Sequence, residues 1–206
     1  MQRRAVLSTL LCSVVSKLAM GEDKRGMRAF VIHMPGHLLE FSLPNDLAWQ
    51  LKDGRVPDYF DPKEPDAFEN AHRTLASAMH DFNGPFWTGA LGSLSFELNV
   101  YQRSTKYEGN VTTAEGLENY IDWWIPTIVR PHAASRFGRV VVNGIPAVSR
   151  GAGSWNETIS FPLDEASFVE FRVRIVAVAG RTSGGWAHKA EVMRDSIRAS
   201  IVVRKK

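Results

Sequence analysis

Apolar and polar positions alternate along much of the chain, which is the pattern of strands that bury one face. On this basis we place strands at residues 28–34, 37–43, 94–101, 139–142, 145–149, 155–161, 168–178 and 201–203. Pro35-Gly36 separates the first two, and Asn143-Gly144, the strongest two-residue signal for a tight hairpin, separates the fourth and fifth. The pattern therefore predicts two β-hairpins within a larger set of antiparallel strands.

Three other segments carry apolar residues at helical spacing, namely residues 66–82, 114–129 and 186–197. Asp66 is a suitable N-cap for the first of them, and the sequence Thr112-Thr113-Ala114-Glu115 opens the second with the pattern of a capping box. Helices mixed among antiparallel hairpins predict the α+β class, with one antiparallel sheet flanked by helices. A doubly wound fold would need regular β-α alternation and a glycine fingerprint, and the sequence has neither.

The first 21 residues differ in character from the rest and predict a cleavable signal peptide. Arg3-Arg4 precedes an apolar run too short to span a bilayer, and residues 19–21 are the kind of small residues that a signal peptidase favours. The arginine pair also resembles a twin-arginine signal, so both export routes stay open. We expect residues 22–206 to be a single periplasmic or secreted domain without a membrane span. The alternative is a cytoplasmic protein that starts at Met27.

Charge and cysteine content narrow the function classes once this leader is set aside. The chain has a formal net charge of +3, but three of its 25 basic residues lie in the leader, which leaves 22 basic against 22 acidic residues. Such a balanced body lacks the basic excess of a nucleic-acid-binding domain. Cys12 is the only cysteine and lies in the leader, where Leu10 and Leu11 do not fit a lipidation signal. We therefore expect no disulfide, thiol nucleophile or cysteine-ligated zinc.

Side-chain spacing along the chain does not match a known catalytic or metal site. His33 and His37 flank a turn and are not a helical zinc pair, and the acidic residues of 58–66 lack the spacing and central glycine of a calcium loop. Ser93 falls in a predicted strand and not at a strand–helix elbow. We therefore expect a protein that is not an enzyme and holds no cofactor or metal, with an unrecognised hydrolase as the alternative.

Several segments of the mature chain resemble the PsbP-like family. The similar segments are TISFPLDEASFVEFRVRIV (158–176), WAHKAEVMRDSI (186–197), RASIVV (198–203), LLEFSLPNDLAWQ (38–50) and GRVVVNGIPAVSR (138–150). They are similar to the strand meander, helix, last strand, early strand and central hairpin of that family. The resemblance implies an α-β-α sandwich around an antiparallel sheet, a fold that is usually non-catalytic and docks protein partners. It carries over no catalytic residues.

Aromatic residues outside the predicted core faces are the candidates for binding. Residues 53–66 form a long loop with three prolines and five acids, and its aromatics have the composition of a docking element. Trp123 and Trp124 cannot both face the core of one helix. The predicted partner-binding residues are Tyr59, Phe60, Asp61, Trp87 and Trp123. The partner would be another protein, such as a toxin, an effector or an envelope component. If these aromatics converge on a groove, a small-molecule or lipid carrier is the alternative, and if they fold back they are core.

Overall fold

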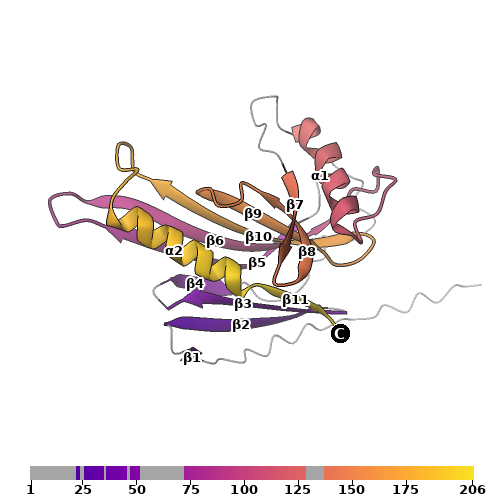
Figure 1. The fold of residues 1–206 in the computed structure, drawn as a ribbon, viewed down its shortest axis with the longest axis horizontal. Helices are drawn as coiled ribbons and strands as arrows, with labels where there is room; N and C mark the ends of the chain where they lie inside the picture. Colours follow the sequence, from indigo (N-terminus) through magenta and orange to yellow (C-terminus); the bar gives the residue numbers. More distant parts are fainter. Residues whose placement is uncertain (1–21, 24–25, 35, 46, 52–71, 129–136) are drawn as a thin grey trace, which may run out of the picture.

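The computed structural model describes residues 22–23, 26–34, 36–45, 47–51, 72–128 and 137–206. Its elements in chain order are β1 (Glu22–Asp23), β2 (Met27–Met34), β3 (His37–Pro44), β4 (Ala48–Leu51), β5 (His72–Asn83), β6 (Ala90–Gln102), α1 (Ala114–Ile128), β7 (Phe137–Val142), β8 (Ile145–Arg150), β9 (Asn156–Pro162), β10 (Ser167–Ala177), α2 (Gly185–Ser200) and β11 (Val202–Lys205). Within these residues the strands form a small sheet, β1-β2-β3-β11, and a large sheet, β4-β5-β6-β10-β9-β8-β7 (Figure 1). The α+β class is confirmed. The expected single sheet is found as two sheets.

Both predicted hairpins are present. Strand β2 pairs with β3, and β7 pairs with β8. Asn143 and Gly144 connect the second pair with φ angles of 51° and 82°, the left-handed conformations of a type I′ turn. The Asn143 amide also donates hydrogen bonds to the carbonyl oxygens of Ala199 and Ile201 at 3.0 and 2.6 Å. This turn therefore fastens the hairpin to the C-terminal end of α2.

Asn143→Ala is expected to lower the free energy of unfolding by about 1–3 kcal/mol, because it removes both hydrogen bonds and places a Cβ-bearing residue without local polar support at positive φ. Equilibrium denaturation in urea measures the change. Asn143→Gly is the matched control, since it keeps the backbone freedom and loses the hydrogen bonds alone. A stability of Asn143→Ala equal to that of the unchanged protein would contradict this role of the turn.

The predicted helix at residues 66–82 is wrong over its described part, because residues 72–83 form β5. Ala78 lies opposite Phe96 and Ala76 lies opposite Leu98, so these small residues point to one face with a period of two. A β-bulge between Thr74 and Ala76 shifts this phase and buries the adjacent Leu75 and Ala76 together. The shift gives the apolar positions a helix-like spacing over a short window. Residues 66–71 lie outside the described residues.

The other two predicted helices are present as α1 and α2. The helix start is where the sequence predicts it, but the cap is shifted by one residue: the Thr113 hydroxyl, not that of Thr112, accepts a hydrogen bond from the Gly116 amide at 3.0 Å. Gly116 then stands where a capping box needs Glu or Gln, so the predicted box is not formed. Helix α2 extends slightly beyond residues 186–197 at both ends and leads directly into β11. The predicted strands are all found, with β6 and β11 longer than expected.

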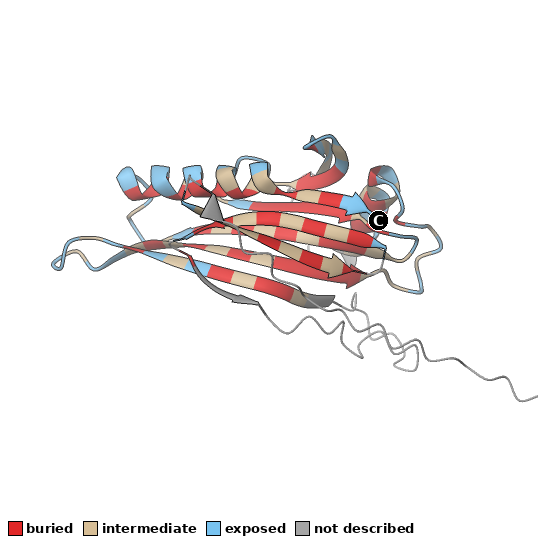
Figure 2. Ribbon diagram, turned by 90° about the horizontal axis from the view of Figure 1, so that it is seen from below, coloured by how far each residue is buried: buried red, intermediate tan, exposed pale blue. Residues whose placement is uncertain are grey.

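The main core lies where the small sheet and α2 pack on one face of the large sheet, which we call the inner face. Phe41 of the small sheet stacks on Phe96 with ring centroids 5.2 Å apart and meets Phe171 edge-on at 5.9 Å. Both partners are almost fully buried. Figure 2 shows the alternation of buried and intermediate residues along the strands that produces this face. Phe171 also meets Phe161 at 5.7 Å, so it lies at the centre of the aromatic core.

Helix α1 packs on the opposite, outer face of the large sheet, at one end. Tyr101 and Phe168 are cross-strand partners on this face and stack with centroids 4.9 Å apart. Tyr120 of α1 meets the Phe168 ring at 5.9 Å. The second core contains Tyr101, Val111, Ala114, Leu117, Tyr120, Ile121, Val148 and Phe168. The strand register places mainly polar side chains on the rest of the outer face, with Met79 and Val176 as exposed hydrophobic exceptions.

Candidate functional site

The sequence-predicted binding residues divide into two described and three undescribed ones. Trp87 lies in the connection between β5 and β6, and Trp123 lies on α1. Tyr59, Phe60 and Asp61 lie outside the described residues.

Trp87 and its neighbour Phe86 occupy the tip of the long β5–β6 hairpin. The Thr88 amide donates to the Pro85 carbonyl at 2.7 Å, which makes residues 85–88 a β-turn with the two aromatics at its centre. The Gly84 amide donates to the Gly89 carbonyl at 2.9 Å and closes the loop. The backbone bonds of the turn are therefore satisfied internally, and the aromatic rings are left to project.

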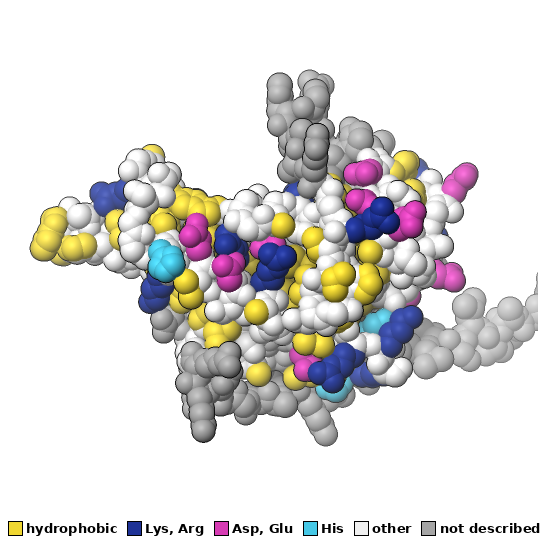
Figure 3. All heavy atoms as spheres, viewed as in Figure 1, with side chains coloured by type: hydrophobic (Ala, Val, Ile, Leu, Met, Phe, Trp, Pro, Cys, Tyr) yellow, Lys and Arg dark blue, Asp and Glu magenta, His cyan; other side chains and the backbone are white. Residues whose placement is uncertain are grey.

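These two rings are the most exposed aromatic side chains in the described part of the chain. Phe86 and Trp87 have relative exposures of 101% and 81%. Figures 1 and 3 show that the hairpin extends past the body of the protein and ends in hydrophobic side chains. We call Pro85–Thr88 with these rings the aromatic tip. Each ring has about 150–250 Å² that a partner can bury, and the hydrogen-bonded turn limits the entropy lost on binding.

Trp123 packs at the edge of the second core and is partly exposed to solvent. Its ring lies 5.4 Å from Tyr107 and 5.9 Å from Tyr120, and 41% of the residue is exposed. Burial raises the pKa of Tyr120 to about 12, although its hydrogen bond from the Ser104 amide opposes the shift. The Tyr120 hydroxyl therefore stays neutral at physiological pH, and Trp123 covers it as an outer layer of this core.

Trp87 and Trp123 do not meet. The 13 residues of β6 separate the aromatic tip from the end of the sheet that α1 covers, a length of about 40 Å. Figure 1 shows the tip and α1 at opposite ends of the molecule. The structure therefore does not bring these two tryptophans into one groove.

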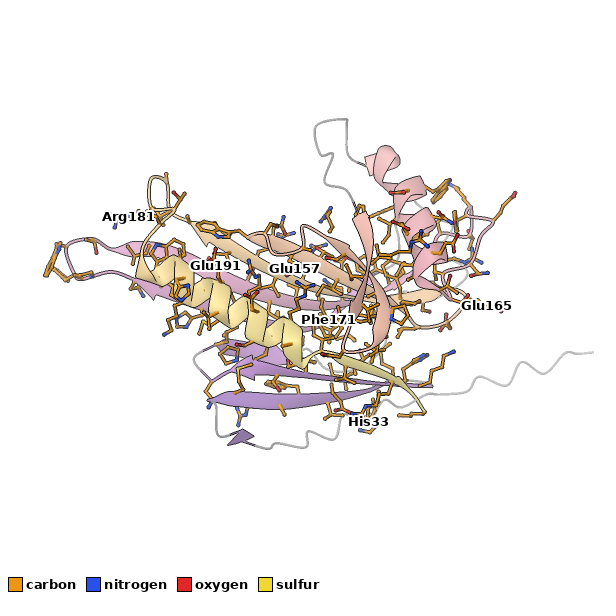
Figure 4. All side chains as sticks on the ribbon, in the orientation of Figure 1. His33, Glu157, Glu165, Phe171, Arg181 and Glu191 are labelled. Carbon is orange, nitrogen blue, oxygen red and sulfur yellow. The ribbon has the colours of Figure 1, made fainter. Side chains whose placement is uncertain are left out.

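A buried carboxyl group beneath α2 was not identified from the sequence. Glu157 lies on the inner face of β9 at 2% exposure, and its Oε1 is 3.2 Å from Arg198 Nη1 (Figure 4). Arg194, also buried, donates to the carbonyl oxygens of Gly153 and Ser154 at 3.0 Å each. These contacts fasten α2 to the turn between β8 and β9. An acidic residue on an otherwise apolar strand face was the available signal.

A shallow groove of about 470 Å³ lies beside this cluster. Its lining residues are Val141, Val142, Asn143, Gly153, Arg194, Asp195, Arg198 and Ala199. Its described lining residues include no serine, histidine or cysteine, and their charged groups form ion pairs, as Arg194 does with Asp195 at 2.9 Å. The arrangement stabilises the position of α2.

The stability of the protein is expected to depend on the protonation of Glu157. Burial raises the pKa of this carboxyl above its ordinary 4.5, while Arg198 and Arg194 oppose the shift. Since the folded state then holds a proton that the unfolded chain has lost, the free energy of unfolding falls as pH rises through this window. Glu157→Gln should remove that contribution, so the stability of the variant relative to the unchanged protein should rise with pH. If the unfolding free energies of Glu157→Gln and the unchanged protein changed in parallel with pH, this role of Glu157 would be contradicted.

The described residues offer no metal site at the two N-terminal histidines. His33 pairs across the hairpin with Leu38, whereas His37 pairs with Met34, so the register directs the two imidazoles to opposite faces. No group of three or more His, Cys, Asp or Glu side chains in the described ranges is placed to hold a metal ion. Among the described helices, none has the length and apolar character to cross a membrane.

No protein-family model, curated protein or solved structure matches the chain.

Proposed function

We propose that the protein is an exported, non-enzymatic module that binds another protein through its aromatic tip. The observation that carries the proposal is the exposure of Phe86 and Trp87 on a turn whose backbone bonds are satisfied. Clustered aromatic side chains are typical of the residues that contribute most to protein interfaces. An immunity or inhibitor protein against a secreted toxin, or an envelope adaptor or chaperone, is the role that fits.

Sequence features support the exported, partner-binding character. Residues 1–21 have the basic start, apolar run and small residues of a signal peptide. The resemblance to the PsbP-like family favours docking over catalysis and an α-β-α sandwich as the underlying arrangement. In agreement with it, α1 and α2 contact opposite faces of the large sheet, although the small sheet shares one of these faces with α2.

The charge of the tip favours a protein over a membrane surface. Residues 83–90, Asn-Gly-Pro-Phe-Trp-Thr-Gly-Ala, contain no lysine or arginine, and the nearest charged residue before them is Asp81. Elements that bind anionic lipid surfaces combine their aromatics with cations. The distance between Trp87 and Trp123 also removes the shared aromatic groove that a small-molecule carrier would use.

The proposal is tested by purifying the mature protein with an affinity tag and comparing two samples. One is a periplasmic extract of the source cells, from which we expect a single stoichiometric protein to be captured. The other is a set of vesicles made from neutral and anionic phospholipids, with which we expect no co-sedimentation. Capture that Phe86→Ser/Trp87→Ser does not reduce, or sedimentation with the vesicles that depends on these two residues, would overturn the proposal.

A further inference from the structure

The outer face of the large sheet carries a second distinctive feature, a row of polar residues beyond the end that α1 covers. Arg150 of β8, Thr158 of β9, Arg172 of β10 and Glu97 of β6 are successive cross-strand partners. Directly opposed residues share a face, with Cβ atoms about 4.5–5.5 Å apart. Arg174 lies two residues beyond Arg172 on the same face. Three arginines therefore share this face, two on β10 and one on β8, with Thr158 of β9 between the two strands.

Arg172, the central arginine of this row, forms ion pairs with two neighbouring glutamates. Arg172 pairs with Glu170 at 2.7 Å and with Glu97 at 3.6 Å. Glu170 also accepts a hydrogen bond from the Tyr101 hydroxyl at 3.3 Å. Burial alone would lower the pKa of Arg172, but Glu170 above all, with Tyr101 and Glu97, raises it. Both glutamates are thus engaged by one cation.

The two flanking arginines, Arg150 and Arg174, form no such ion pair with a carboxylate in the described part of the chain. Within the described residues the structure gives Arg150 a ring contact with Phe137 at 5.5 Å but no ion pair or hydrogen bond, and it gives Arg174 neither. Burial lowers the pKa of Arg150, the charge of Glu170 opposes this shift, and repulsion from Arg172 and Arg174 adds to it. Among the described residues this face therefore holds two arginines that form no ion pair with a carboxylate.

Buried donors at the same place also lack partners. The Thr158 hydroxyl, on a residue that is 1% exposed, and the Nε atoms of Arg172 and Arg174 are buried without a hydrogen bond. An unsatisfied buried donor costs about 1–3 kcal/mol, so its persistence calls for an acceptor. Arg150 and Arg174 are two strands apart and two residues out of register, about 12 Å between their backbones, a span that two arginine side chains can close on one group between them.

We propose that Arg150, Thr158 and Arg174 form a binding site for an oxyanion, the phosphate, sulfate or carboxylate group of a small ligand. Guanidinium groups bind such oxygens through two parallel hydrogen bonds, and the threonine hydroxyl adds a third donor. The site lies on the face of the sheet and not at the aromatic tip, so it is independent of the proposed protein partner.

The test is a titration of the purified protein with inorganic phosphate, sodium sulfate and sodium acetate, each at constant ionic strength set with sodium chloride. At ten times the Kd we expect a saturable rise in Tm of about 3–6 °C. A response to phosphate and sulfate assigns a phosphorylated or sulfated ligand, and a response to acetate assigns a carboxylate. The absence of a saturable response to all three salts would overturn the proposal.

Matched variants locate the site. Arg150→Gln and Arg174→Gln are each expected to weaken anion binding about tenfold or more, while their Tm without added anion stays close to that of the unchanged protein. Arg139→Gln is the control, because Arg139 is exposed on the same sheet and pairs with Glu118 at 3.0 Å. Equal anion affinity in Arg150→Gln and the unchanged protein would overturn the assignment.

The guanidinium Nε–H signals of Arg172 and Arg174, followed by NMR during the titration, test the position of the site without substitution. Phe86→Ser/Trp87→Ser should bind phosphate normally, which separates this site from the tip.

Discussion

Replacing Phe86 and Trp87 together with serine is expected to weaken binding of the partner protein about 100-fold to 1,000-fold while leaving the fold intact. Interface aromatics that act as hot spots each contribute about 2 kcal/mol or more, and both rings here are free to be buried by a partner. Because neither ring belongs to a core, their removal costs the folded state little. Isothermal titration calorimetry with the captured partner measures the affinity, and thermal unfolding measures the stability.

Val192→Ser provides the matched control for this double variant. Val192 is a hydrophobic residue on α2 with 50% exposure, so its replacement changes surface hydrophobicity away from the tip. We expect its affinity to stay within about twofold of the unchanged protein. A loss of affinity in Val192→Ser as large as that in the double variant would show that the partner does not recognise the tip.

Phe171→Ala is expected to lower the free energy of unfolding by about 3–5 kcal/mol, a larger loss of stability than that expected for Asn143→Ala. Phe171 is 1% exposed, and its ring meets Phe41, Phe96 and Phe161 at 5.9, 6.3 and 5.7 Å. Truncation therefore opens a cavity between the small and large sheets and removes aromatic contacts to both. Denaturation in urea should show a lower midpoint with little change in slope.

Two further variants separate cavity formation from the loss of any aromatic residue. Phe171→Leu keeps most of the volume and should cost clearly less than Phe171→Ala. Phe86→Ala removes the same ring from the exposed tip and should leave stability within about 0.5 kcal/mol. If Phe171→Ala were no more destabilising than Phe86→Ala, the packing of the two sheets through this residue would be refuted.

The elements that the sequence predicted well are those with local causes. Asn143-Gly144 needs no tertiary information to form a type I′ turn, and the start of α1 at Ala114 follows from the local threonines, although Thr113 and not Thr112 caps it. The alternation in β10 likewise predicts a strand, because its two faces differ in polarity. The β5 strand was missed because a bulge next to Leu75 gave its apolar residues a helix-like spacing. Such a bulge depends on pairing with β6 and leaves no clear local signal.

The candidate sites were predictable to different degrees for the same reason. Trp87 was identifiable because Gly84, Pro85 and Gly89 mark a turn that leaves its aromatics outside the sheet. The distance between Trp87 and Trp123 could not be predicted from the sequence, because it depends on how β6 runs between the two residues. The row of Arg150, Thr158 and Arg172 was also hidden. These residues lie far apart in the sequence, and the register of β8, β9 and β10 alone brings them together.

The most direct measurement is photo-cross-linking with a benzophenone side chain in place of Trp87, with the same group in place of Val192 as control. Irradiation in the source cells should give one discrete cross-linked protein for position 87 and none for position 192, since a benzophenone reacts with groups in direct contact. Cross-links to lipid alone, or the same protein cross-linked from both positions, would contradict a role of the tip in recognising a protein partner.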